Sequence, residues 1–148
     1  MIAAFQQQYP HIQSRVVDCR YLDREEDIVN GDFDKVFSNA AMHWILRDPL
    51  TRADVMAACF AALKPGGTMV CESGGLGNVA EVHAALIGEL LRRGVPVQRA
   101  REVSPWWFPS LEEMRALVEG AGLRWERGEV ELRQTKLTEF EGGGIKGW

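Results

Sequence analysis

Residues 33–44 constrain the fold most, because a short apolar run there gives way to small residues and then to a helix-compatible segment. Val36 and Phe37 follow the turn-forming residues 30–32 and are too few for a helix, which predicts a buried strand of a parallel sheet. Ser38 to Ala41 then lie at the carboxyl end of that strand. Ligands of open α/β sheets bind at this edge, so the pattern predicts a ligand site there.

The other elements are predicted from apolar spacing and from residues that start or stop helices. Helices are expected over residues 1–8, 49–63, 79–91 and 111–121, and further strands over residues 15–18, 68–72 and 123–132. Asp48 is the expected N-cap of the second helix, and Ser110 and Glu113 have capping-box spacing at the start of the last one. Alternating strands and helices predict an α/β fold.

Composition argues against several classes of partner without excluding them. The 148 residues suffice for one domain with a core. The formal net charge of -4 does not provide the positive surface that nucleic acid or an anionic membrane would attract. No apolar run approaches the roughly 20 residues that span a bilayer, so we expect a soluble protein in the cytoplasm. Cys19, Cys59 and Cys71 lack ligand spacing, which predicts reduced, packed thiols and no metal site.

Two motifs, in the expected order, resemble class I S-adenosylmethionine-dependent methyltransferases, in the branch that contains the trans-aconitate and other small-molecule methyltransferases. Residues 33–44, Phe-Asp-Lys-Val-Phe-Ser-Asn-Ala-Ala-Met-His-Trp, are similar to the fourth-strand motif of that family, and residues 63–70, Leu-Lys-Pro-Gly-Gly-Thr-Met-Val, to its junction into the fifth strand. The resemblance implies a partial Rossmann-like fold, with a mostly parallel sheet flanked by helices. Residues 15–18 would be its third strand and residues 123–132 its sixth.

The resemblance also implies that parts of the family's domain are missing. Strands 1 and 2, with their glycine-rich loop and acidic strand end, have no counterpart, and residues 140–148 resemble only the turn before the last strand. We therefore expect residues 1–148 to form a single incomplete methyltransferase domain with exposed apolar faces. The chain is then either a fragment of a longer methyltransferase, which is the favoured interpretation, or a short natural relative whose sheet is completed in a homodimer.

Cofactor-binding residues are assigned by the same resemblance. Asp18 would accept a hydrogen bond from the adenine amino group, and the backbone amide of Cys19 would meet a ring nitrogen. Asn39 and Ala40 would lie beside the methionine part of S-adenosylmethionine. The alternative for Asp18 is a structural one, in which its carboxylate caps the turn that follows.

His43 and four aromatic residues are the candidates for the substrate side. An unperturbed histidine titrates near pH ~6.5, so His43 is a candidate general base or would orient an acidic substrate; alternatively it only begins the next helix. The family resemblance implies that His43 and Trp44 lie at the pocket mouth and that the segment of Trp106, Trp107 and Phe108 covers the pocket. The alternative for the two tryptophans 106 and 107 is burial in the core.

The predicted function is transfer of a methyl group from S-adenosylmethionine to a small molecule, with carboxylic acids as one substrate class. Gly74, Gly75 and Gly77 lack the spacing of a nucleotide-binding loop. The expected partner is a small-molecule substrate, and we expect no binding of nucleic acid or of a membrane. Either a second copy of the chain or a missing N-terminal segment would complete the sheet. The alternative is a non-catalytic methyltransferase-like module that dimerises or binds a partner.

Overall fold

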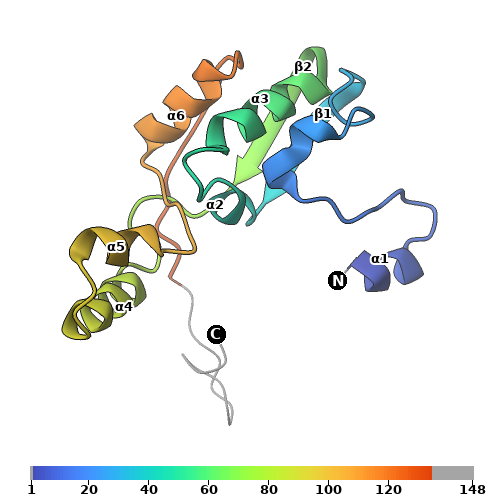
Figure 1. Cartoon of the computed structure of the whole chain (residues 1–148). Coiled ribbons are helices and arrows are strands. Elements are labelled where there is room, and N and C mark those ends of the chain that lie inside the picture. Colours follow the sequence, from blue (N-terminus) through green and yellow to red (C-terminus); the bar gives the residue numbers. More distant parts are fainter. Residues whose placement is uncertain (1, 135–148) are drawn as a thin grey trace.

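The computed structural model of the chain describes residues 2–134 (Figure 1). The predicted turn at residues 140–148 lies outside this range. The elements follow in the order α1 (Ile2–Gln8), the 3-10 helix η1 (Cys19–Arg24), β1 (Phe33–Asn39), α2 (Met42–Ile45), α3 (Arg52–Ala62), β2 (Leu63–Glu72), α4 (Ala80–Arg92), α5 (Val97–Glu102) and α6 (Leu111–Gly120). In the described residues no helix has the length and apolarity needed to cross a membrane.

The sheet of the described residues consists of β1 and β2, which pair in parallel. Helix α3 connects them, so the two strands form a β-α-β unit, and Figure 1 shows α3 packed over the sheet with α6 beside it. The register aligns Phe37 with Val70 and Asn39 with Glu72, which brings both carboxyl ends to one edge. The predictions of a parallel sheet and of an α/β fold are confirmed by this unit.

The core lies on one face of the sheet only. Alternate strand residues, among them Val36 and Met69, pack against buried residues of α2 and α3 and of the turn between them. The buried cluster consists of Met42, Leu46, Val55, Met56 and Cys59.

The opposite face of the sheet is uncovered. Phe37 is 73% exposed and its partner in the register, Val70, is 55% exposed. The prediction of a buried strand is therefore wrong for this face, because among the described residues no element packs on it, and on the other face Val36 and Ser38 are half-buried. The expectation of exposed apolar faces agrees with this arrangement.

Two predicted strands are absent from the described structure. Neither residues 15–18 nor residues 123–132 form a strand. A strand requires a neighbour that pairs its N–H and C=O groups, and neither segment lies in register beside β1 or β2. Instead Asp18 is the N-cap of η1, where its side chain accepts a hydrogen bond from the Arg20 N–H. The structural alternative for this residue is thus realised.

The helices are largely as predicted. In α6 the capping box is complete, because Ser110 Oγ accepts from the Glu113 N–H at 3.2 Å and Glu113 Oε2 accepts from the Ser110 N–H at 2.7 Å. The helix expected from Asp48 begins later, at Arg52, because Asp48 Oδ1 accepts a hydrogen bond from the Leu50 N–H and holds a turn there. Helix α5 was not predicted.

The three cysteines are free thiols, as expected. Cys59 is buried in the core, and burial raises its pKa to about 11. Burial is also the main cause of the raised pKa of Cys71 on β2 and of Cys19 on η1. A raised pKa removes thiolate at neutral pH, so these side chains act as small apolar groups rather than nucleophiles.

Candidate functional site

The carboxyl ends of β1 and β2 meet at the edge where the sequence predicts a ligand site. Asn39 ends β1 with an exposed side chain, and Ala40 follows in the left-handed region at φ 51°. The Ala40 N–H donates to the backbone oxygen of Glu72 at 3.0 Å and lies 3.2 Å from its carboxylate Oε2. These contacts join the two strand ends and turn the chain into α2.

His43, in α2, faces the end of β2. Its Nδ1 accepts a hydrogen bond from the Gly74 N–H at 3.2 Å, and Ser73 Oγ lies 3.2 Å from the same nitrogen. Partial burial lowers the pKa of His43, while the nearby Glu72 carboxylate acts in the opposite direction. The imidazole is therefore held neutral against the sheet edge at pH 7.

Aromatic rings surround His43 from two segments that are far apart in the sequence. Its ring centroid lies 5.6 Å from that of Trp44 and 5.6 Å from that of Phe108. Trp106 stacks on Phe108 at 5.7 Å and meets Trp44 edge-on at 5.5 Å. The ring of His83, from α4, lies edge-on to Trp106 at 6.2 Å. The structure thus brings the rings of Trp44, Trp106 and Phe108 together beside His43. We call these three rings the aromatic cluster. His83 contacts it through Trp106.

Backbone contacts hold the loop that provides Trp106 and Phe108. The Trp107 N–H donates to the His43 backbone oxygen at 2.9 Å, and the Leu76 N–H donates to the Pro109 oxygen at 2.8 Å. This loop is consequently tied both to α2 and to the segment after β2. The rings of the aromatic cluster are placed by tertiary contacts rather than by one helix face.

Trp107 lies apart from the aromatic cluster. Its ring packs against the core cluster, and the Arg52 guanidinium stacks over it at 3.7 Å from the ring centroid. Arg52 is itself held by the Leu46 backbone oxygen at 2.8 Å from Nε. Alternate residues of an extended loop point to opposite sides, which explains why residues 106 and 108 share a side and residue 107 does not.

Asp18 borders a shallow hollow of about 200 Å³ together with Trp44, and the other residues that line it are Arg20, Ile45 and Arg47. The Arg20 guanidinium donates to both carboxylate oxygens of Asp18, with Nε 3.0 Å from Oδ1 and Nη2 2.6 Å from Oδ2. Hydrogen bonds from Arg20 lower the pKa of Asp18 to about 2, so the carboxylate is charged at neutral pH. Cys19 begins η1 next to it, with a half-buried thiol.

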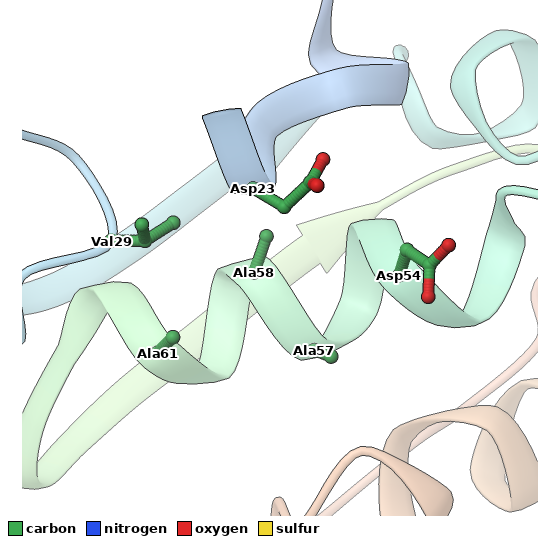
Figure 2. A pocket seen from close by; sticks show the side chains of 6 residues that line it. All are labelled: Asp23, Val29, Asp54, Ala57, Ala58 and Ala61. Carbon is green, nitrogen blue, oxygen red and sulfur yellow. The ribbon is translucent and has the colours of Figure 1, made fainter. Parts of the chain in front are cut away.

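A second hollow, of about 250 Å³, lies between η1 and α3 (Figure 2). Two of its residues are acidic, Asp23 and Asp54, and the others are small or apolar: Val29, Ala57, Ala58 and Ala61. None of the predicted site residues lines it. Within residues 2–134 no group of three or more His, Cys, Asp or Glu side chains is arranged to hold a metal ion.

Sequence reasoning missed several residues of the site. Ser73 and Gly74 contact His43, and Glu72 joins the strand ends, but in the sequence this segment was considered only as a nucleotide-binding loop, which its glycine spacing does not match. The sequence feature that could have identified Ser73 and Gly74 as site residues was their position directly after a predicted strand. The carboxyl ends of two parallel strands meet at one edge of the sheet. Arg20 was missed because nothing in the sequence marks it as the partner of Asp18.

Comparison with known proteins tests the predicted methyltransferase family. No protein-family model matches the chain. The chain is similar to a protein of Schizosaccharomyces pombe named "Uncharacterized methyltransferase C70.08c", with 38% identity over 120 residues, which are 81% of this chain and 46% of that protein. The chain therefore spans about half the length of this curated relative. A homologue with that name supports the interpretation of this chain as part of a methyltransferase, in agreement with the motifs of residues 33–44 and 63–70.

Proposed function

We propose that this chain contributes to an S-adenosylmethionine-dependent methyltransferase that acts on a small molecule. The similarity to the fission yeast methyltransferase carries the proposal. The geometry supports it, because the two methyltransferase-like motifs pair as the parallel strands β1 and β2, and the carboxyl ends of these strands meet at one edge, where an open α/β sheet binds its ligand. Since the chain spans 46% of that relative, we further propose that other segments complete the domain in a longer polypeptide.

The residues at this edge fit the adenosyl end of S-adenosylmethionine. Asp18 is an ionised carboxylate and therefore only an acceptor, which suits the exocyclic amine of adenine. Trp44 is 49% exposed and offers an aromatic ring to the same hollow. Arg20 has to release Asp18 first, and exposed ion pairs of this kind are weak. Asn39 and Ala40 would hold the methionine part of the cofactor, which would supply an electrophilic methyl group.

The chain's own residues would bind and orient the methyl acceptor. The aromatic cluster offers apolar ring surface to a planar or apolar substrate. Holding the acceptor at a fixed position is the main requirement for a displacement reaction, because the donor is already activated. His43, beside this cluster, is a polar group whose ring is fixed by hydrogen bonds at Nδ1.

Titration with S-adenosylmethionine tests this proposal. The chain of residues 1–148 should bind it no more tightly than about millimolar, because the family's glycine-rich loop has no counterpart in it. NMR shifts should be confined to Asp18, Cys19 and residues 39–44, and ATP, which carries the same adenine but no methionine part, should not reproduce the shifts of Asn39 and Ala40. Asp18→Asn should abolish the shifts. Asp54→Asn, in the second hollow, is the matched control and should leave them unchanged. Micromolar binding measured by calorimetry, or shifts elsewhere, would contradict the proposal.

One observation favours a second candidate function, a non-catalytic module that dimerises through its sheet. Phe37 and Val70 are paired across the strands and both are exposed on the uncovered face. Size-exclusion chromatography should then show a dimer that S-adenosylmethionine does not affect, and Phe37→Lys should convert it to a monomer. Leu50→Lys, at a site 86% exposed and outside the sheet, should leave the dimer intact. A monomer at every concentration would exclude this function.

A further inference from the structure

The carboxylate of Asp18 is fully used by one neighbour, Arg20. Its Oδ1 accepts hydrogen bonds from the Arg20 backbone N–H at 3.2 Å and from Arg20 Nε at 3.0 Å. Its Oδ2 accepts from Arg20 Nη2 at 2.6 Å and also lies 3.2 Å from Nε. A carboxylate has about four lone-pair sites, two on each oxygen. Arg20 therefore fills the acceptor sites that Asp18 would offer to a ligand.

The contacts of Arg20 with Asp18 are of two kinds. The backbone N–H bond is the N-cap of η1 and does not depend on the side chain at position 20. The guanidinium makes the other contacts, from Nε and Nη2. Loss of the guanidinium would thus free most of the carboxylate and leave the helix cap in place. Capping of η1 and occupation of Asp18 are separable.

Release of the guanidinium breaks a single exposed ion pair. The side chains of Arg20 and Asp18 are 37% and 49% exposed, and pairs of this kind are weak. The remaining direct contact of the guanidinium within the described residues is with the Tyr21 ring, whose centroid lies 5.5 Å from Cζ. Both Arg20 and Asp18 line the hollow that Trp44 borders. A ligand that enters this hollow with a donor group therefore competes directly with the guanidinium.

We propose that the Arg20–Asp18 pair is an autoinhibitory contact: the guanidinium occupies Asp18 in the empty chain, and adenine binds only after the guanidinium has moved away. The inference rests on the proposed function, because it concerns the regulation of the site that this function assigns to adenine. The exocyclic amine of adenine is a donor and takes the place of the guanidinium on the carboxylate. The contact lowers the affinity for the adenosyl group by no more than about fivefold, since the ion pair is exposed.

NMR of the full chain without a ligand tests whether the contact is closed. The Nε–H signal of Arg20, identified by its loss in Arg20→Met, should exchange with water more slowly than that of Arg24. Arg24 lies in the same 3-10 helix, and its guanidinium stacks over the Tyr21 ring at 4.3 Å without a hydrogen bond to Asp18. Addition of adenosine should speed the exchange at Arg20. Equally fast exchange at the two arginines in the free chain, or slow exchange that persists with adenosine bound, would overturn the inference.

Arg20→Met measures how much the contact weakens binding. Methionine retains the backbone N–H of the cap and removes the guanidinium donors, so adenosine should bind about two- to fivefold more tightly than to wild type. Arg24→Met changes the net charge equally and should bind adenosine as wild type does. Inosine lacks the exocyclic amine, so Arg20→Met should not tighten its binding. Equal affinity of wild type and Arg20→Met for adenosine would contradict the proposal.

Ionic strength provides a second test, because adenosine is uncharged and salt then acts on the ion pair. Raising sodium chloride from about 0.05 to 0.5 M should tighten adenosine binding to wild type about twofold and leave Arg20→Met unchanged. The same response in both proteins would overturn the inference. If adenosine shifts Asp18 in both with one affinity, the autoinhibitory contact fails and the proposed cofactor site stands. If neither protein binds adenosine or S-adenosylmethionine, the proposed function fails and the inference with it.

Discussion

Replacing Leu46 by alanine is expected to lower the free energy of unfolding by about 2–5 kcal/mol. Leu46 is 0% exposed and belongs to the buried cluster with Met56 and Val55, which is the core of the described residues. The substitution removes buried methyl groups and leaves a cavity that this small core fills only in part. A single domain of this size has about 5–15 kcal/mol of stability, so the substitution should remove a large share of it.

The matched control for this substitution lies four residues away in the chain. Leu50 is 86% exposed, and Leu50→Ala should change the unfolding free energy by no more than about 0.5 kcal/mol. Urea denaturation followed by circular dichroism measures both variants. Leu46 immediately follows α2, the helix that provides His43 and Trp44, so Leu46→Ala should also weaken the hydrogen bonds at Nδ1. Equal effects of the two substitutions would show that the buried cluster does not determine stability.

Gly74→Ala is the second substitution with a large expected effect. A Cβ atom on Gly74 would lie 2.5 Å from Asn78 Nδ2 and 2.7 and 2.9 Å from two atoms of the Phe108 ring. The amide of Asn78 can rotate away, but the ring is held by its loop and by Trp106. Overpacking of this kind costs about 1–3 kcal/mol of stability. The displaced ring should also move His43 and shift its NMR signals.

Gly88→Ala is the matched control for Gly74→Ala and should have the opposite sign. Gly88 lies inside α4, and a Cβ there would meet nothing within 4 Å. Alanine in a helix interior is more favourable than glycine by roughly 0.5–1 kcal/mol, so this variant should be more stable than wild type. Thermal denaturation compares the two. A Gly74→Ala protein as stable as wild type, with unchanged His43 signals, would contradict the close packing of Phe108 on Gly74.

The opposite effects expected at the two glycines reflect how the site is constructed. The segment after β2 approaches the aromatic loop so closely that position 74 has no room for a side chain. The same approach brings the Gly74 N–H to His43. Packing and hydrogen bonding at the sheet edge are therefore coupled, and a change in either should alter the orientation of the imidazole.

Local patterns in the sequence were enough to predict β1, β2 and most of the helices. Val36 and Phe37 between turn residues predicted a strand, and the spacing of Ser110 and Glu113 predicted the capping box of α6, because these features depend on residues a few positions apart. The strands expected at residues 15–18 and 123–132 failed for the opposite reason. A strand depends on a pairing partner, and the partner is not encoded within the segment itself.

The sequence by itself determined that β1 and β2 are parallel strands with small residues and a histidine at their carboxyl ends, since periodicity and turn residues are local properties. Only the tertiary structure decided what His43 contacts there. Ser73 and Gly74 lie 30 and 31 positions further along the chain, and Phe108 comes from another loop. The tautomer of the ring depends on which donors reach it, and chain topology, not local sequence, places those donors.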